Sequence, residues 1–257
     1  MKTVRLVLVA LAFATAWLGL DIAFPAAIAT GIPFALTRIV VDGLILLALW
    51  RLGLGVTVGI PLVIWEILAW TLAINGTFAR TTALPGPLPF AIVVPIVVAL
   101  ALLMSSKRVA AAIDVTPASW LIGIQLYRAI GGTFLVFFAR GVMPWFFALP
   151  AGIGDVTVGL LALPTALWVS SGTPAGRAAA VRWNILGLID LAVAVATGFL
   201  STRGPNPNVQ LGAFPTALIP AFAVPTSIIL HALSLWQLRR MTRHASASTT
   251  IPLAAHA

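Results

Sequence analysis

Ionisable residues interrupt several long apolar runs of this sequence, and they are the residues best able to do chemistry there. Two arginines in such runs, Arg38 and Arg128, can neutralise at most two acids. A charged side chain at bilayer depth costs a few kcal/mol unless it is paired or hydrated. The acids in these runs outnumber the arginines and comprise Asp21, Asp42, Glu66, Asp155 and Asp190. The surplus acids must therefore be protonated, hydrated or compensated by a bound cation.

The depth of each polar residue follows from its position along its run, at about 1.5 Å per residue of helix. Asp21 and Arg38 fall near one end of their runs, where a place in the lipid headgroup region would explain them. The deeper residues form a ladder, which we interpret as a pathway for a substrate or a proton. Its predicted members are Asp42, Asp155, Glu66, Arg128, Gln125, Asp190, Asn184 and His231.

Arg128 is the member of this ladder that most needs a partner, because arginine stays protonated in proteins. The acids at suitable depth are Asp155, Asp190 and Glu66. Either a structural salt bridge between the two halves of the chain or a site for a substrate anion or proton relay would satisfy it. Four residues separate Arg38 from Asp42, so that pair suits a structural ion pair as well as a site.

His231 does not indicate a cofactor. A haem held on both faces needs a second histidine, and His244 and His256 lie at or beyond the basic end of the last apolar run. A metal site formed with Asp155 and Asp190 would match no known ligand spacing. We therefore predict no metal and no cofactor, and expect His231 to bond helices together or to handle protons.

Composition places the chain in a membrane. Of its 257 residues, 61% are hydrophobic and only 8% are charged, whereas soluble domains have about a quarter charged. The formal charge of +9 does not indicate nucleic acid, because the positive residues lie between apolar runs rather than on one face. Without cysteine, the chain can form no disulfide and no thiolate site.

The apolar runs predict an all-α helical bundle with eight crossings, since about 20 apolar residues span a bilayer. The first run follows MKTVR and has a possible cleavage site, but its length favours a retained helix. The predicted crossings are 4–24, 33–50, 55–75, 88–105, 118–139, 148–170, 180–200 and 213–238.

The distribution of lysine and arginine predicts that both ends of the chain are cytoplasmic. With eight crossings, ten of these residues fall on the side of the N-terminus and three, Arg80, Arg140 and Arg203, on the other. Cytoplasmic loops carry such an excess. We therefore expect both the N-terminus and the C-terminus on the cytoplasmic side of the membrane.

An internal duplication is also predicted. Phe-Ala-Leu precedes an aspartate by six residues at both Asp42 and Asp155, and Trp65-Glu66-Ile67-Leu68-Ala69 aligns with Trp183-Asn184-Ile185-Leu186-Gly187. Copies of four helices each must have the same orientation, which makes a parallel repeat. The predicted units are 1–105 and 118–241, with a linker at 106–117 and a disordered tail at 242–257. Chance similarity among apolar helices is the alternative.

Three segments resemble a group of uncharacterised multi-pass bacterial membrane proteins. They are WLIGIQLYRAIGG at 120–132, FALPAGIGD at 147–155 and RWNILGLIDL at 182–191. The resemblance covers mostly the second half of the chain and implies a bacterial inner-membrane location. It implies no activity.

Three functions fit these features. The first is a proton- or cation-linked transporter of a small solute, with Arg128 and Asp190 paired near the midplane between the repeats and Asp155, Glu66 and His231 as proton carriers. The second is a membrane enzyme acting on a lipid or quinone, with Asp155, Asp190 and His231 as acid/base groups. The third, with no catalysis, is an assembly protein whose buried charges fix helix partners. The only partner common to all is the lipid bilayer, and the sequence predicts neither the solute nor an oligomeric state.

Overall fold

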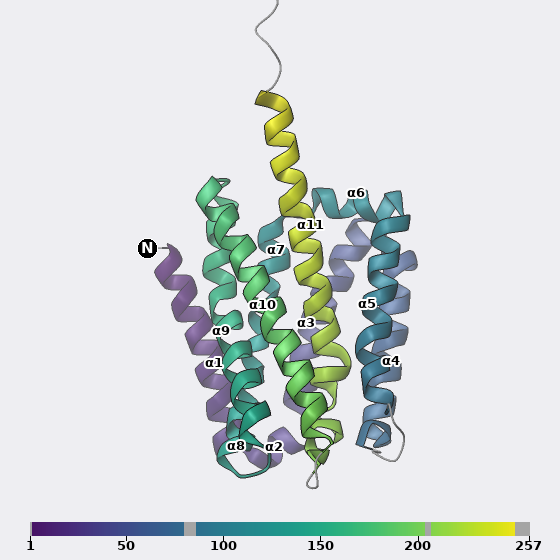
Figure 1. Ribbon diagram of the computed structural model, residues 1–257, viewed down its shortest axis with the longest axis vertical. Coiled ribbons are helices and arrows are strands. Elements are labelled where there is room, and N and C mark those ends of the chain that lie inside the picture. The colour runs from purple at the N-terminus through teal and green to yellow at the C-terminus, as the bar shows by residue number, and fades with distance from the viewer. Residues whose placement is uncertain (1, 80–85, 204–206, 250–257) are drawn as a thin grey trace, which may run out of the picture.

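The fold is that of a computed structural model, which describes residues 2–79, 86–203 and 207–249. The first half of the described chain forms six α-helices and two short helical segments (Figure 1). In order they are α1 (Lys2–Ala23), α2 (Pro25–Ala29), α3 (Ile32–Arg51), the π-helix η1 (Gly55–Gly59), α4 (Ile60–Ile74), the 3-10 helix η2 (Thr77–Ala79), α5 (Pro87–Ser105) and α6 (Lys107–Val115).

The second half contains the remaining helices. They are α7 (Ala118–Gly123), the 3-10 helix η3 (Ile124–Gly132), α8 (Thr133–Ala139), α9 (Trp145–Ser170), α10 (Pro174–Ser201), the 3-10 helix η4 (Val209–Gly212), the π-helix η5 (Ile219–Ala223) and α11 (Val224–Thr249). The segments α7, η3 and α8 follow one another without a gap and form a single crossing.

The described residues contain eight helical spans that are long and apolar enough to cross a membrane, in agreement with the eight predicted crossings. The chain is therefore an integral membrane protein. The last span begins at Ile219 and not near residue 213, because residues 213–217 form turns around Pro215. Proline has no N–H to give to a helix, and Pro220 in turn lies within the π-helical turn of η5.

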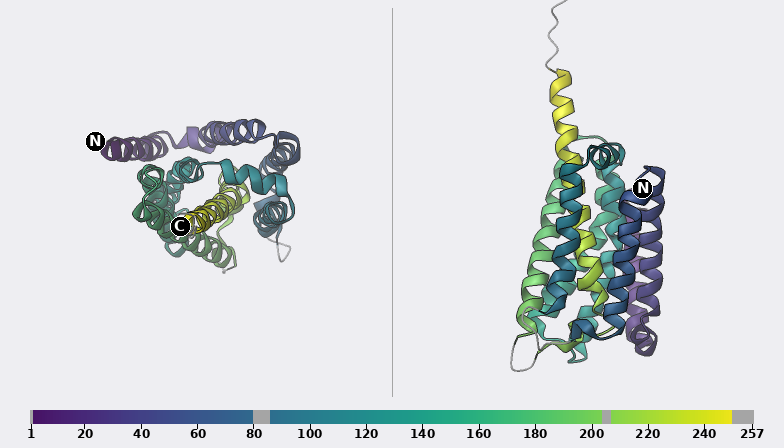
Figure 2. Two further views of the ribbon diagram at one scale, coloured as in Figure 1. Left: turned by 90° about the horizontal axis from the view of Figure 1, so that it is seen from above. Right: turned by 90° about the vertical axis from the view of Figure 1, so that its right-hand side faces the viewer.

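The second-half helices form the compact part of the bundle, while the first-half helices lie around it. Viewed along the bundle axis, α11 lies near the centre and α1 and α3 form a row along one side (Figure 2). Large apolar side chains such as Leu44, Ile64 and Val97 are exposed on the first-half helices. Those surfaces suit contact with lipid.

One end of the bundle is marked by α6, which we call the α6 end, and the other by η4, which we call the η4 end. The first residues of α1 and the last turns of α11 lie at the α6 end (Figure 1). The short helix α6 lies across this end with Val109, Ala112 and Ile113 buried. An ion pair of 2.9 Å between Arg240 Nε and Asp114 Oδ1 joins it to α11.

The first part of the tail that was predicted to be disordered from Thr242 belongs to α11. Helix α11 continues to Thr249, because residues 242–249 contain no glycine or proline that would end it. Residues 250–257 and Arg80 lie outside the described residues. The cytoplasmic orientation, the duplication and the unit boundaries stay predictions.

Candidate functional site

The candidate site begins with the 3-10 helix η3 in the middle of the fifth span. Residues three apart lie in line on a 3-10 helix, whereas on an α-helix they drift around the axis. Gln125, Arg128 and Gly131 therefore share one face of η3, and all three are fully or almost fully buried. This face points at α9, α10 and α11, where the partners of Arg128 lie.

Arg128 lies at the centre of a group that we call the Arg128 centre: Gln125, Arg128, Asp155, Asp190, Asn184 and His231. Its Nε donates to Asp155 Oδ1 at 2.8 Å, and its Nη2 lies 2.7 Å from the same oxygen. Nη2 also donates to Asp190 Oδ2, and Nη1 lies 3.1 Å from His231 Nε2. One guanidinium thus joins α9, α10 and α11 to η3.

These contacts determine the tautomer of His231. Arginine can only donate hydrogen bonds, so His231 Nε2 must accept from Arg128 and cannot carry a proton. The ring is then neutral with its proton on Nδ1, which donates to Asn184 Oδ1 at 2.9 Å. Asn184 Nδ2 in turn donates to Ser234 Oγ at 3.0 Å and to the Ala180 carbonyl at 2.8 Å. His231 therefore orients Arg128.

Gln125 completes the α6 side of this centre. Its Nε2 lies 3.5 Å from His231 Nδ1, and its Oε1 has no hydrogen-bond partner among the described residues although the side chain is fully buried. The ring of Trp183 covers the imidazole of His231 with the ring centroids 4.9 Å apart.

Three glycines make room for these side chains. A β-carbon on Gly131 would lie 2.5 Å from Asp155 Cβ, and one on Gly154 would meet the carboxylate of Asp190. A β-carbon on Gly187 would meet the His231 ring and lie 3.1 Å from Arg128 Nη1. None of these three glycines was among the predicted site residues. The three-residue spacing of Gln125, Arg128 and Gly131 was the available signal.

The charges of the Arg128 centre do not balance. One guanidinium faces two carboxylates, and the neutral His231 adds nothing, so the centre carries one negative charge when both acids are ionised. Carboxylates that share a site repel one another. A proton or a cation at Asp155 or Asp190 would remove the imbalance.

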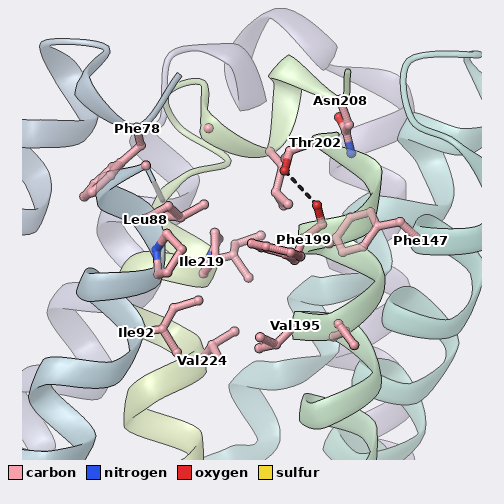
Figure 3. A pocket seen from close by; sticks show the side chains of 18 of the residues that line it. Phe78, Leu88, Ile92, Phe147, Val195, Phe199, Thr202, Asn208, Ile219 and Val224 are labelled. Carbon is pink, nitrogen blue, oxygen red and sulfur yellow. Dashed lines mark hydrogen bonds between the residues drawn. The ribbon is translucent and has the colours of Figure 1, made fainter. Parts of the chain in front are cut away.

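A cavity of about 350 Å³ reaches Asp155 from the η4 end of the bundle. It lies between α5 and α10, with η5 behind it, and side chains such as Leu88, Ile92 and Val195 make it apolar (Figure 3). Among the described residues that line it, Asp155 is the one acid. Its side chain is 13% exposed, and Oδ2 takes part in no hydrogen bond of the described residues.

The mouth of the cavity faces sideways as well as toward the η4 end. Val93 on α5, Phe199 on α10 and Val209 on η4 line it and are between 43% and 56% exposed. An apolar molecule could therefore enter it from the hydrocarbon of the bilayer. Thr202 and Arg203 supply polar groups at the η4 end.

Two members of the predicted ladder do not join the Arg128 centre. Asp42 pairs with Arg38 on its own helix at 2.5 Å, and Glu66 interacts with these two residues rather than with Arg128. The Arg128 centre was expected between the two predicted repeats, and it contains no residue of the first of them. All six members come from spans five to eight, because the face of α4 that carries Glu66 turns toward α3.

Asp21 and Arg38, which a place in the headgroup region would explain, are packed against other parts of the protein. Both are buried, with exposed fractions of 0% and 3%. Asp21 interacts with Thr133 and Arg140, and Arg140 Nη2 donates to the Asp21 carbonyl at 2.8 Å. Within the described residues, no group of three or more His, Cys, Asp or Glu side chains could hold a metal ion.

Comparison with protein-family models matches residues 85–239 to one family, described as a domain of unknown function (DUF8737). The matched range contains the whole Arg128 centre and the α5 and α10 walls of the cavity, and it leaves out Arg38, Asp42 and Glu66. No curated protein and no solved structure matches the chain. Because the family model matches more than half of the sequence, the chain belongs to the family described as domain of unknown function DUF8737.

Proposed function

We propose that this integral membrane protein is a proton-linked transporter of small apolar solutes that carry one positive charge. Asp155 would exchange a proton for the solute. The observation that most directly supports this proposal is that Asp155 belongs to the Arg128 centre and also lines the apolar cavity.

The charge imbalance supports exchange rather than simple binding. Asp155 and Asp190 depend on the single guanidinium of Arg128, so the centre holds one negative charge too many. A proton or a cationic solute can neutralise that charge, but the two compete for the same carboxylate. Competition of this kind couples the movement of one to the movement of the other.

The cavity supports an apolar solute. Its walls are aliphatic and aromatic except at Asp155 and at the η4 end. A solute with a positive group and an apolar body would place its charge at Asp155 and its body between α5 and α10. We further propose that the η4 end faces outward and the α6 end faces the cytoplasm of a bacterial inner membrane, because the α6 end carries most of the lysine and arginine.

Transport of hexyltrimethylammonium into proteoliposomes would test the proposal. This probe has an apolar chain and a fixed positive charge, and it carries no acidic proton, so any pH change must come from the protein. With a proton gradient across the vesicle, we expect the probe to move against the proton flow. Hexanol and hexanoate have the same chain without the positive charge, and we expect neither to move protons through the protein.

Two variants sharpen this test. Asp155→Asn keeps the size of the side chain but cannot bind a proton for exchange, so coupled transport should be lost. Asp114→Asn makes the same chemical change on α6, outside the Arg128 centre, and should transport like the unsubstituted protein. Full transport by Asp155→Asn, or transport of hexanoate in place of the cation, would exclude the proposal.

An enzyme acting on a lipid or quinone is the second candidate, favoured by the sideways opening of the cavity. Asp155 and Asp190 would then serve as acid/base groups. This candidate predicts a chemically altered lipid after incubation of the protein with membrane extract, detected by mass spectrometry and absent with Asp155→Asn. A purely structural role for the charges instead predicts that variants in which paired charges are both replaced by neutral residues keep the fold and leave the phenotype of the host cell unchanged.

A further inference from the structure

A second group of ionisable side chains lies between α3 and α4, apart from the Arg128 centre. Arg38 Nη2 donates to Asp42 Oδ1 at 2.5 Å, and both side chains are almost fully buried. The Arg38 guanidinium carbon lies 4.1 Å from the ring centroid of Phe222 and 5.6 Å from that of Tyr127. Arg38 therefore makes one hydrogen bond in the described residues, and two aromatic rings lie beside its guanidinium.

Glu66 adds a second carboxyl to this pair. It approaches from α4, and its carboxyl interacts directly with that of Asp42. Ionised carboxylates only accept hydrogen bonds, so a hydrogen bond between two carboxyls requires that one of them be protonated. The contact favours such a proton, because two carboxylates that share a site repel one another.

The surroundings also favour a proton. Arg38 neutralises one carboxylate, and Tyr127 is the other titratable group of the described residues that faces the pair. The Tyr127 hydroxyl lies 2.6 Å from Ser227 Oγ and 3.1 Å from the Ala223 carbonyl, so it does not serve Asp42. Glu66 itself is only half-buried on a helix that exposes large apolar side chains, where an ion without a partner would be costly.

Some buried polar atoms of this group have no hydrogen-bond partner in the described chain, which also favours a bound proton. Asp42 Oδ2 is buried and accepts no hydrogen bond from a nitrogen or hydroxyl of the described chain. Arg38 Nε and Nη1 are also buried without an acceptor. Oδ2 is therefore free to accept the proton that Glu66 would donate.

We propose that Asp42 and Glu66 form a proton-binding site in which two carboxyls share one proton, beside the permanent charge of Arg38. Loss of the proton breaks one O–H bond, releases H⁺ to water and leaves two carboxylates facing one guanidinium. The site does not depend on the proposed transport, because every contact that defines it lies outside the Arg128 centre.

Infrared spectroscopy of the protein in lipid nanodiscs tests this site, because protonated carboxyls have a carbonyl stretching band that carboxylates lack. Glu66→Gln should remove one such band from the spectrum at neutral pH. Asp42→Asn should remove the same band, since Arg38 then neutralises Glu66 and no proton is needed. Asp155→Asn should leave this band unchanged, which separates the site from the Arg128 centre.

Three outcomes would overturn the proposal. The band could survive in both variants, which would mean that no proton is bound here. It could vanish in only one of them, which would assign the proton to a single carboxyl. It could vanish from the unsubstituted protein on addition of sodium at constant pH, which would make the group a metal-cation site.

Chemical labelling keeps the test independent of how well the variants fold. Dicyclohexylcarbodiimide is apolar and reacts with protonated carboxyls, so it should modify Glu66 of the unsubstituted protein from the lipid side. Mass spectrometry should locate the adduct on Glu66, and labelling should decrease as the pH rises. Absence of the adduct, or labelling that ignores pH, would contradict a bound proton.

Discussion

Replacement of Arg128 by glutamine should destabilise the protein much more than neutralisation of either acid that it contacts. Arg128 donates to Asp155 and Asp190 and lies 3.1 Å from the acceptor nitrogen of His231. Its removal leaves two buried carboxylates without a cation. Asp155→Asn, by contrast, leaves one guanidinium with one carboxylate.

The magnitudes follow from these contacts. Removal of one partner of a buried ion pair costs about 3–5 kcal/mol, because the other charge stays buried and unpaired. We expect Arg128→Gln to lower the free energy of unfolding by that amount. Asp155→Asn loses one charge-assisted hydrogen bond, worth about 1.5–3 kcal/mol. It also removes the repulsion between two carboxylates, and Asn Oδ1 can still accept from Arg128 Nε, so its net cost should lie below about 1.5 kcal/mol.

Denaturant titration in detergent micelles, followed by tryptophan fluorescence, measures both losses. The triple variant Arg128→Gln/Asp155→Asn/Asp190→Asn has no buried charge left at this centre and should recover most of the stability lost in Arg128→Gln. Equal losses for Arg128→Gln and Asp155→Asn would refute the charge count. So would a triple variant as unstable as Arg128→Gln alone.

Three further predictions concern the groups around the centre. Gly187→Ala should lower the free energy of unfolding by about 1–3 kcal/mol, because the new β-carbon would overpack against His231. Gly19→Ala is the control, since no atom lies within 4 Å of its new β-carbon, and equal losses for the two variants would contradict the close approach of Gly187 to His231. Asn184→Ala should cost about 1–3 kcal/mol, because His231 Nδ1 loses its acceptor, and an unchanged unfolding curve would contradict the assigned tautomer. Val195→Trp should fill the cavity and weaken the binding of hexyltrimethylammonium, as measured by calorimetry, without changing the contacts of the Arg128 centre. Undiminished binding would show that the probe binds elsewhere.

Hydropathy predicted the spans because contact with lipid needs long apolar helices, whichever way they pack. The same physics predicted the acids of Arg128: an arginine that cannot lose its proton must find carboxylates at its own depth, and Asp155 and Asp190 were two of the three candidates. The third, Glu66, was wrong as a partner of Arg128. Depth alone does not say which way a helix face turns, and that depends on packing against neighbouring helices.

The 3-10 segment and the cavity could not be predicted in this way. On an α-helix Gln125, Arg128 and Gly131 drift around the axis by about 60° at each step, whereas the 3-10 geometry of η3 lines them up. The cavity depends on the gap between α5 and α10, which belong to different halves of the chain. That gap depends on how the two helices pack, which the sequence of neither helix alone determines.

Burial of Asp21 and Arg38 has a similar cause. Position near the end of an apolar run does not indicate burial, which arises because α1 and α3 pack against the second half at these residues. Trp17 Nε1 donates to Thr133 Oγ1 at 2.9 Å one turn before Asp21, and Phe222 covers Arg38. Such contacts join segments about a hundred or more residues apart, beyond the reach of local pattern.

The most direct test of the proposed exchange is the number of protons released when hexyltrimethylammonium binds to the purified protein. Calorimetry in two buffers of different ionisation enthalpy gives this number at constant pH. We expect release of about one proton per bound probe from the unsubstituted protein, because the probe takes the place of the proton at Asp155. We expect the same release from Asp114→Asn and none from Asp155→Asn. Binding without proton release, or unchanged release from Asp155→Asn, would contradict exchange at Asp155.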